Sequence, residues 1–469
     1  QMMYAMGLDS LKRNADGAAP VMEQLEAIKA VSDEKELSAM IGKMHVESAS
    51  PFFGFYIGAD EKNSTMNLLQ FFQGGISMGD RDYYLLDDEN TVKIRDAYKV
   101  YVNRLFTLAG YSAEEAAEAA KTVIDLETEI AKVSVDRATR RDVHKNYNKM
   151  TVKEFTSRFD FIDWEVFFKE TGICKSEELN ASQVTFFEGL TKLLKNVSLE
   201  DQKDYLAFKL LNSAANYLSD DFVNASFDFY GKALQGKEEN QPRWKSSLAV
   251  VNRSLAEAFG QMYVEKYFPA SSKEKMLEMV ANLQTALGER IDALEWMSDE
   301  TKAKAQEKLG TFIVKVGYPD KWKDYTALEI RNDSYWANIC RANVFAHRDM
   351  MEDEGQPVDR TEWGMSPQTV NAYYNPTTNE ICFPAAILQP PFFNPDADDA
   401  VNYGGIGVVI GHEMTHGFDD QGRNYDKDGN ISAWWTKEDE EKFNERAKVL
   451  VEQYDKIVVL DTLHADGSY

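Results

Sequence analysis

Apolar residues recur at helical spacing along the first two thirds of the chain. Residues three and four positions apart share one face of a helix, so such stripes predict amphipathic helices that pack on a core. Two of these stripes consist of Ile124, Leu126, Ile130 and Val133, and of Met276, Met279, Val280 and Leu283.

Helix starts can be placed from capping-box spacing, in which a hydroxyl residue is followed three positions later by an acidic residue. In that pattern the two side chains satisfy backbone N–H groups that have no partner within the helix. Four segments have this spacing: residues 112–115, 151–154, 198–201 and 271–274. Together with the stripes, they predict a mainly helical region.

The pattern changes after about residue 310. Residues 311–316 are apolar enough for a strand, and residues 379–384 predict a second strand that ends at a proline. A proline-rich loop region separates these strands from a helix predicted at about 403–418, and an amphipathic helix is expected to start near Thr436. The fold class is therefore mainly α, α+β overall, with a domain boundary placed near residue 330.

Composition excludes several classes of function. The 469 residues include 52 Lys and Arg against 78 Asp and Glu, a net charge of −26, which disfavours binding to nucleic acid or to an anionic membrane surface. The three cysteines, Cys174, Cys340 and Cys382, are far apart in sequence. A disulfide framework and a cysteine-based zinc site are therefore not expected.

The strongest chemical signal is the H-E-x-x-H pattern at residues 412–416. On a helix, His412 and His416 share a face, so both imidazoles can reach one Zn²⁺. Zinc lowers the pKa of a coordinated water towards neutrality, and Glu413 is placed to act as the general base that accepts its proton. This combination is typical of peptide-bond hydrolysis.

The third zinc ligand is not evident from the residues. A metzincin needs a glycine and a third histidine soon after His416, and Asp419 and the Gln421-Gly422 pair occupy that stretch instead. The other large class uses a downstream glutamate, but the available ones lie on a strongly charged helix, where a solvated face is the better interpretation. They are Glu438, Glu440, Glu441, Glu445 and Glu452. His464 is interpreted as a loop residue.

Motifs around the zinc pattern carry a resemblance to a known family. They comprise residues 370–374, 383–385, 388–393, 402–407, 417–423 and 434–435, with further matches at 81–84 and 147–151. Together these segments resemble the neprilysin family of zinc metallopeptidases, which includes bacterial oligopeptidases. The similarity extends over nearly the whole chain.

The resemblance implies a large, mostly helical cap domain, residues 1–330, and a thermolysin-like catalytic domain, residues 331–469, enclosing a chamber. It places Asn371 and Ala372 on an edge strand that pairs with the substrate backbone. It also places Phe392, Phe393 and Val409 near a pocket for an apolar side chain, with core packing as the alternative for the two phenylalanines. Asp419 and Asp420 could orient groups around the metal, or could be ordinary helix-end or surface carboxylates.

The chain departs from the family at its third ligand. The family supplies a glutamate from a G-E-N-x-x-D segment roughly 60 residues after the second histidine, whereas 53 residues follow His416 and contain no such segment. We therefore expect the catalytic domain to lack its C-terminal part, with a remaining C-terminal fragment as a partner that carries the third zinc ligand.

The H-E-x-x-H pattern favours a zinc-dependent endopeptidase with one Zn²⁺ per site. The family resemblance implies oligopeptide substrates and cleavage before hydrophobic residues. The alternative is a non-catalytic peptide-binding protein that retains the fold, although the intact Glu413 argues against it. An aminopeptidase is disfavoured because the expected G-x-M-x-N sequence is not present upstream. The scarcity of cysteine suggests a bacterial member, unlike the disulfide-rich animal ones. The expected location is the cell envelope, periplasmic or extracellular.

Overall fold

The computed structural model describes residues 1–460 and 463–467 and divides the chain into two compact units. The first unit comprises residues 1–58, 67–255 and 324–356, and the second comprises residues 59–66, 256–323 and 357–469. The units therefore interleave along the chain, whereas the boundary predicted near residue 330 divides the chain once. Helical periodicity shows which face of a helix is buried but not which core receives it, so it could not reveal this exchange of segments.

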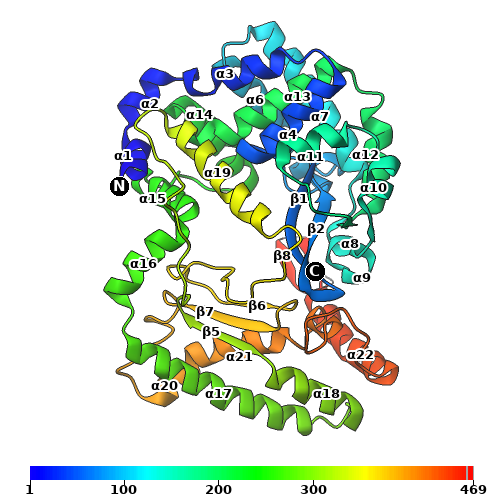
Figure 1. Cartoon of the computed structure of the whole chain (residues 1–469), viewed down its shortest axis with the longest axis vertical. Coiled ribbons are helices and arrows are strands. Elements are labelled where there is room, and N and C mark those ends of the chain that lie inside the picture. The colour runs from blue at the N-terminus through cyan, green and yellow to red at the C-terminus, as the bar shows by residue number, and fades with distance from the viewer. Residues whose placement is uncertain (461–462, 468–469) are drawn as a thin grey trace. The chain divides into compact units, whose positions relative to one another are not determined.

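The first unit is built mainly from helices (Figure 1). Its helices are α1 (Met2–Leu8), α2 (Ser10–Asp16), α3 (Ala19–Lys29), α4 (Glu34–Glu47), α5 (Asp82–Leu85), α6 (Glu89–Leu108), α7 (Ala113–Val133), α8 (Arg137–Arg141), α9 (Val143–Asn146), α10 (Val152–Arg158), α11 (Trp164–Thr171), α12 (Val184–Leu194), α13 (Leu199–Ala214), α14 (Asp220–Ser226), α15 (Arg243–Ser254) and α19 (Tyr335–Glu352). A 3₁₀ turn (Ala215–Tyr217) and a π-helix (Phe227–Ala233) flank α14.

A small mixed sheet completes this unit. Its strands are β1 (Phe53–Asp60), β2 (Asn63–Gln73), β3 (Lys149–Thr151) and β4 (Glu178–Ala181), in the order β1-β2-β4-β3. β2 and β4 are parallel, with Leu69 opposite Leu179, and the tip between β1 and β2 belongs to the second unit. The core beneath the sheet is rich in aromatic rings that are fully buried, among them Phe53, Phe71, Phe155, Phe167 and Phe187.

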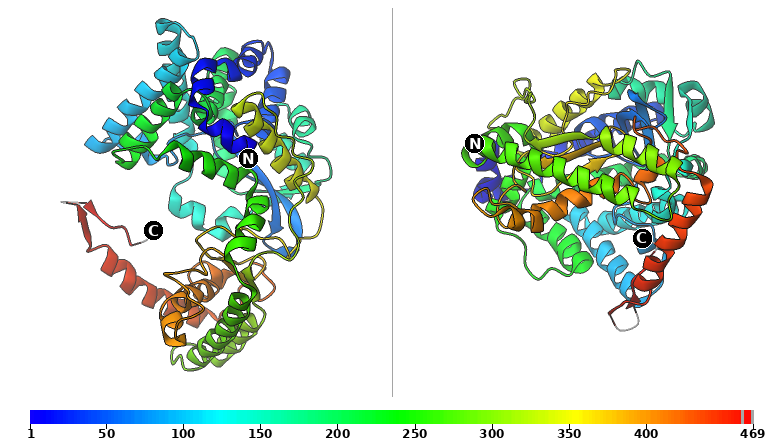
Figure 2. Two further views of the ribbon diagram at one scale, coloured as in Figure 1. Left: turned by 90° about the vertical axis from the view of Figure 1, so that its left-hand side faces the viewer. Right: turned by 90° about the horizontal axis from the view of Figure 1, so that it is seen from below.

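The second unit holds the H-E-x-x-H pattern. Its elements are α16 (Ala256–Tyr267), α17 (Ala270–Asp292), α18 (Asp299–Gly310), β5 (Ile313–Gly317), β6 (Tyr373–Asn375), β7 (Glu380–Pro384), α20 (Asp399–Gly404), α21 (Ile406–His416), a 3₁₀ turn (Gly422–Asn424), α22 (Lys437–Tyr454), β8 (Val458–Leu460) and β9 (Leu463–His464). The three-stranded sheet has the order β5-β7-β6, with β5 parallel and β6 antiparallel to β7. α17 packs against α18, α21 and β5 (Figure 2).

Most helix starts agree with the capping signals. Ser112 and Glu115 form a complete capping box at α7, and Thr151, Ser198 and Thr436 each accept a backbone N–H at the start of a helix. The start predicted at 271–274 is wrong, because α17 already begins at Ala270, directly after a proline. The mainly α fold class is confirmed, and both predicted strands are present as β5 and β7 with small shifts in their bounds.

The helix predicted at 403–418 is divided into α20 and α21. The break is at Gly405, whose backbone angles (φ −95°, ψ −96°) are not helical. A Cβ atom at this position would lie 2.5 Å from the carbonyl oxygen of Phe392, so only glycine allows the two segments to approach this closely. Because of this break, α20 and α21 are two separate helices and not one continuous helix.

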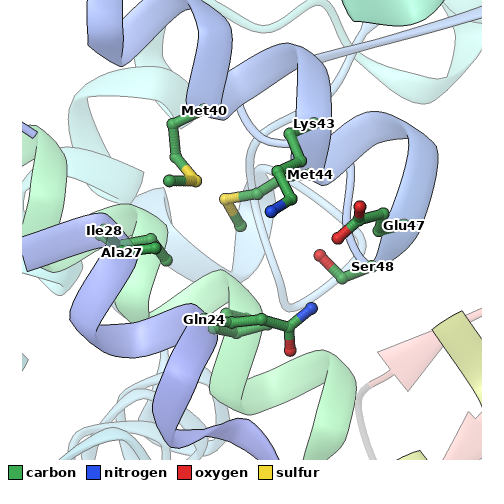
Figure 3. A pocket seen from close by; sticks show the side chains of 9 residues that line it. Gln24, Ala27, Ile28, Met40, Lys43, Met44, Glu47 and Ser48 are labelled. Carbon is green, nitrogen blue, oxygen red and sulfur yellow. The ribbon is translucent and has the colours of Figure 1, made fainter. Parts of the chain in front are cut away.

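Two further observations bear on where function resides. A pocket of the first unit is lined by Gln24, Ala27, Ile28, Met40, Lys43, Met44, Glu47, Ser48 and Leu210 (Figure 3). These side chains include no histidine or cysteine, so the pocket offers little to a zinc ion. Within residues 1–460 and 463–467, no helix combines the length and the apolar character needed to cross a lipid bilayer.

Candidate metal centre

Helix α21 presents the two histidines of the H-E-x-x-H pattern away from its buried face. Ile406, Ile410 and Met414 recur every four residues and are fully buried in the core of the second unit. His412 and His416 lie on the other side of the helix, where His412 is exposed and His416 is half-buried. Anchoring by the apolar stripe therefore fixes the direction in which both imidazoles point.

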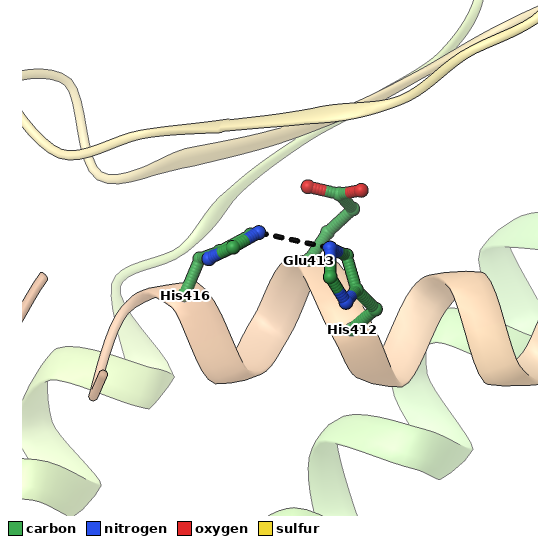
Figure 4. Close-up of side chains that lie close together, drawn as sticks. All are labelled: His412, Glu413 and His416. Atoms are coloured by element: carbon green, nitrogen blue, oxygen red, sulfur yellow. Dashed lines mark hydrogen bonds between the residues drawn. The ribbon is translucent and has the colours of Figure 1, made fainter. Parts of the chain in front are cut away.

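The two imidazoles converge on one point. The Nε2 atoms of His412 and His416 lie 2.9 Å apart, and the rings are nearly perpendicular (Figure 4). Two nitrogen ligands of a tetrahedral zinc, each about 2.0–2.1 Å from the metal, are about 3.3 Å apart. A small opening of the pair would bring both atoms to that separation. Among the described residues, His412, Glu413 and His416 form the one group of three or more His, Cys, Asp or Glu side chains whose ligand atoms all lie within 4.8 Å of one another.

Glu413 projects from the same helix beside the two imidazoles (Figure 4). Its side chain is 5% exposed, in contrast to the exposed His412 before it. Burial raises the pKa of the Glu413 carboxyl above its ordinary value, and the neighbouring imidazoles of His412 and His416 oppose the shift. A carboxylate whose pKa is raised towards neutrality is better suited to accept and return a proton than an exposed one.

Asp419, predicted as one of two candidates for orienting the metal site, lies against His416. Its Oδ2 atom is 2.7 Å from Nδ1 of His416. Since an ionised carboxylate can only accept, Nδ1–H of His416 donates, and in the neutral ring this tautomer has no proton on Nε2, as a zinc ligand requires. The other candidate, Asp420, accepts a hydrogen bond from the side chain of Gln421 at 2.7 Å.

A buried lysine that the sequence analysis did not single out lies beneath the loop after α21. Lys308 of α18 is 1% exposed, and its Nζ donates to the carbonyl oxygens of Gly417, Gly422 and Tyr425, each at 2.7 Å. Burial lowers the pKa of the Lys308 ammonium to about 7, although the carboxylates of Asp426 and Asp419 oppose the shift. The sequence signal that could have indicated its burial is its position at helical spacing after Thr301 and Ala305, two buried residues of α18.

The residues predicted to contact substrate lie at two places in the second unit. Asn371 is exposed and Ala372 is buried, and both come directly before β6, the last strand in the order β5-β7-β6. α21 packs against β6, so this strand runs beside the metal centre. The role of Asn371 and Ala372 in binding the substrate backbone stays a prediction.

The predicted apolar pocket residues differ in burial. Phe393 is 1% exposed and belongs to the core of the second unit, as the core-packing alternative supposed, whereas Phe392 is 37% exposed. Val409 of α21 is half-buried against the same core. The role of these residues in substrate recognition stays a prediction.

The downstream acidic residues do not approach the two imidazoles in the described part of the chain. Glu438, Glu440, Glu441, Glu445 and Glu452 are all exposed on α22, and the detected metal-ligand group contains none of them. His464 is exposed on β9, where its Nδ1 contacts the carbonyl oxygen of Asp455. The prediction that the third ligand comes from a further segment therefore remains untested.

A helix carrying two convergent imidazoles and a buried carboxylate, beside an edge strand, defines the zincin class of fold and site. The sequence profile described as peptidase family M13 matches residues 1–319 and 371–469. The chain therefore belongs to peptidase family M13, the neprilysin family of zinc metallopeptidases, and the resemblance drawn from its motifs is confirmed.

Named relatives agree with this assignment. The chain is 34% identical over 462 residues to an endothelin-converting enzyme homolog of Locusta migratoria, covering 94% of this chain and 62% of the relative. It is 33% identical over 476 residues to endothelin-converting enzyme 1 of Homo sapiens, covering 97% of this chain and 61% of the relative. The chain thus spans about three fifths of the length of these curated relatives.

Solved structures show the same fold. The crystal structure of Mycobacterium tuberculosis zinc metalloprotease ZMP1 in complex with an inhibitor matches with a TM-score of 0.95 and 38% identity, covering 100% of this chain and 72% of that one. The crystal structure of PEPO from Lactobacillus rhamnosis matches with a TM-score of 0.88 and 24% identity, over 100% of this chain and 74% of that one.

Proposed function

We propose that this chain is part of a zinc-dependent endopeptidase that hydrolyses oligopeptides, with Glu413 as general base. The observation that carries the proposal is the convergence of two Nε2 atoms 2.9 Å apart next to a buried carboxylate on the same helix. Membership of peptidase family M13 supports the same activity. Cleavage before hydrophobic residues is part of the proposal and rests on the family resemblance.

The donors present fit zinc rather than a harder cation. Two imidazole nitrogens are typical zinc ligands, whereas Mg²⁺ and Ca²⁺ prefer oxygen ligands. The hydrogen bond from His416 to Asp419 fixes the imidazole tautomer that a metal needs. When bound by His412 and His416, zinc supplies a Lewis acid that polarises the scissile carbonyl and lowers the pKa of water.

Glu413 supplies the proton transfers of the proposed reaction. Its carboxylate accepts the proton of the attacking water and then returns it to the nitrogen of the leaving amine. Burial favours this role because it raises the pKa of the Glu413 carboxyl. The proton affinity of the carboxylate thereby comes closer to those of the water and the leaving amine with which it exchanges a proton. His412 and His416 are engaged as ligands and are not assigned a proton transfer.

The substrate is proposed to lie along the edge strand. β6 pairs with β7 on one side and packs against α21, and Asn371 and Ala372 come directly before it in the chain. An extended peptide that adds to this edge would be held by backbone hydrogen bonds, which favour peptides over other amides without reading a particular sequence. Phe392 and Val409 are the partly exposed apolar side chains proposed to receive the residue after the cleaved bond.

We propose that a glutamate from a further segment completes the zinc site. Two histidines leave a catalytic zinc one protein ligand short of the usual three. Support comes from exposed apolar side chains on the last elements of the second unit, which are suited to packing against additional protein. These are Val449, Leu450, Tyr454, Ile457, Val458 and Val459.

The proposal can be tested on the product of the intact gene. His412→Ala is expected to lose bound zinc and cleavage of a quenched fluorescent oligopeptide, while His464→Ala, an exposed histidine on β9, keeps both. A zinc chelator should abolish cleavage by the unaltered protein, and added zinc should restore it. Stoichiometric zinc and full cleavage by His412→Ala would refute the proposal. Zinc binding without any cleavage would favour a peptide-binding protein.

A further inference from the structure

Lys308 occupies an unusual place for a charged side chain. It lies in the buried stripe of α18 with Thr301 and Ala305, yet it ends in an ammonium group that is 1% exposed. Its three protons are matched by three carbonyl oxygens at 2.7 Å, those of Gly417, Gly422 and Tyr425. All three carbonyls belong to the segment that directly follows His416, the second histidine of the metal centre.

Aromatic rings surround the same ammonium group. The Nζ atom lies 5.7–5.8 Å from the ring centroids of Tyr374, Phe418 and Trp434. The faces of aromatic rings attract a cation, and their bulk excludes water from the group. Lys308 therefore acts within this loop as a bound cation would, by drawing three separate carbonyl groups to one point.

A short series of hydrogen bonds connects Lys308 to the metal centre. The Gly422 carbonyl accepts from Nζ of Lys308, and the Gly422 N–H donates to Oδ1 of Asp419 at 2.7 Å. The N–H of Gln421 donates to the same Oδ1 atom at 2.9 Å. The other oxygen of Asp419, Oδ2, accepts from Nδ1–H of His416 at 2.7 Å. One residue, Gly422, thus links the buried cation to the carboxylate that orients a zinc ligand, through the two peptide groups on either side of its Cα atom.

The geometry leaves the Gly422 peptide little freedom. A Cβ atom at Gly422 would lie 1.7 Å from the carbonyl oxygen of His416, so the loop passes directly against the end of α21. Lys308 fixes the position of the Gly422 carbonyl and so of the adjoining peptide group, whose N–H donates to the carboxylate of Asp419. The N–H of the peptide that carries this carbonyl, that of Arg423, donates to the backbone carbonyl oxygen of Asp419 at 3.1 Å. Without the ammonium group, each of the three carbonyl oxygens would lose a hydrogen bond, and the loop would gain by rearranging towards water. The oxygens of Gly422 and Tyr425 would keep only the bonds from the Tyr425 N–H at 3.1 Å and the Trp434 Nε1–H at 2.9 Å.

We propose that Lys308 is a positioning residue of the metal centre, which sets the Asp419 carboxylate through Gly422 and so holds His416 ready to bind zinc. This inference rests on the proposed function, because it assigns the ligand that Asp419 orients to a zinc site. It goes beyond that function by making zinc affinity depend on a residue of α18 that does not itself contact the metal ligands.

A double-mutant cycle on zinc affinity tests the inference. Removing a partner that orients a metal ligand typically costs 10–100-fold in affinity, so Lys308→Met should weaken zinc binding about tenfold or more. In the Asp419→Asn background the same change should cost less than about twofold, because the carboxylate through which Lys308 acts is already lost. Equal losses in both backgrounds, or no loss in the folded Lys308→Met protein, would overturn it.

Lys315→Met is the matched control. Lys315 is also buried in the second unit, where it pairs with Glu380 at 2.7 Å on β5 and β7. Its removal should lower stability while leaving zinc affinity within about twofold in the folded protein. If Lys308→Met does not fold, Lys308→Arg enters the same cycle, since it keeps the charge but cannot aim one compact donor group at three carbonyls.

A second measurement separates failure of this inference from failure of the proposed function. The ¹⁵N signals of the His416 ring report its tautomer without zinc, and Lys308→Met should reduce the fraction protonated at Nδ1. Absence of zinc binding by the unaltered protein would contradict the proposed function. An unchanged His416 tautomer in folded Lys308→Met would contradict the positioning role, whether or not zinc binds.

Discussion

The carboxylate of Asp419 lies 2.7 Å from Nδ1 of His416 and is three residues away in sequence. A metal-binding histidine commonly donates its second ring N–H to such a group, which fixes the ring and its tautomer. Asp419→Asn should therefore weaken zinc binding about 10–100-fold, as measured by competition with a chromogenic chelator. Asp420→Asn is the control and should change affinity less than about twofold. Equal effects of the two substitutions would contradict this assignment.

Asp439 joins the starts of two helices and should stabilise the second unit. Its fully buried carboxylate accepts from the hydroxyls of Thr301 and Thr436 at 2.6 and 2.8 Å, and from the backbone and side chain of Ser298. Loss of such a buried acceptor costs about 1–3 kcal/mol, so Asp439→Asn should lower the free energy of unfolding by that amount at pH 7. Urea denaturation measures the difference, with the exposed Glu438→Gln as control.

The pH dependence of this effect has a definite sign. Burial raises the pKa of the Asp439 carboxyl, but hydrogen bonds from Ser298, Thr301 and Thr436 prevail and lower it to about 2, against an ordinary 3.8. A depressed carboxyl pKa adds stability above the unfolded value, and that stability is lost as the pH falls through 3.8 towards 2. The gap between wild type and Asp439→Asn should narrow between pH 7 and pH 3. A constant gap would contradict this explanation.

His45 should make the first unit sensitive to acid. Its ring packs against Phe53, Phe55 and Phe167, and burial lowers its pKa from 6.5 to about 3. Between those values the unfolded chain binds a proton that the folded chain does not, so the free energy of unfolding falls as the pH drops below 6.5. His45→Phe should reduce this dependence between pH 6.5 and pH 4.5, as measured by thermal unfolding.

The control for this prediction is His144→Gln, which replaces an exposed histidine of the first unit. In this variant the free energy of unfolding should depend on pH as it does in the unaltered protein. A His45→Phe protein whose stability follows pH as steeply as wild type would show that the buried imidazole is not the responsible group.

Gly405 and Gly404 offer a matched pair at the break before α21. A Cβ at Gly405 would lie 2.5 Å from the Phe392 carbonyl oxygen, whereas one at Gly404 has no non-neighbouring atom within 4 Å. Gly405→Ala should lower the free energy of unfolding by about 1–3 kcal/mol and weaken zinc binding, because it displaces the start of α21. Gly404→Ala should be neutral or slightly stabilising, since alanine favours helix. Similar urea midpoints for both variants would contradict this explanation.

The parts of the site that could be predicted from the sequence depend on local spacing. His412 and His416 are four residues apart on a helix, and the capping signals at Ser112 and Thr436 involve residues three apart. Such relationships are set by helix geometry alone. The family motifs added the architecture of a helical cap domain and a thermolysin-like catalytic domain, because a distinctive set of segments specifies a whole fold rather than one element.

The remaining features depend on contacts between distant segments. Lys308 donates to carbonyl oxygens of the loop after α21, more than 100 residues away in sequence. The residues around Lys308 in α18 do not indicate which carbonyl groups it will contact. Asp419 and Asp420 are adjacent and chemically identical, so only the path of the loop decides which one faces His416. The break at Gly405 was missed for the same reason, since it is caused by the nearby backbone of Phe392.

The central claim is that Glu413 transfers the proton in a zinc-dependent hydrolysis. The most direct measurement compares Glu413→Gln with Glu438→Gln in the product of the intact gene, recording bound zinc and the rate of oligopeptide cleavage together. Glu413→Gln should keep its zinc and lose about 10²–10⁴-fold in rate, while Glu438→Gln should match wild type in both. A zinc-loaded Glu413→Gln protein that cleaves at the wild-type rate would contradict the claim.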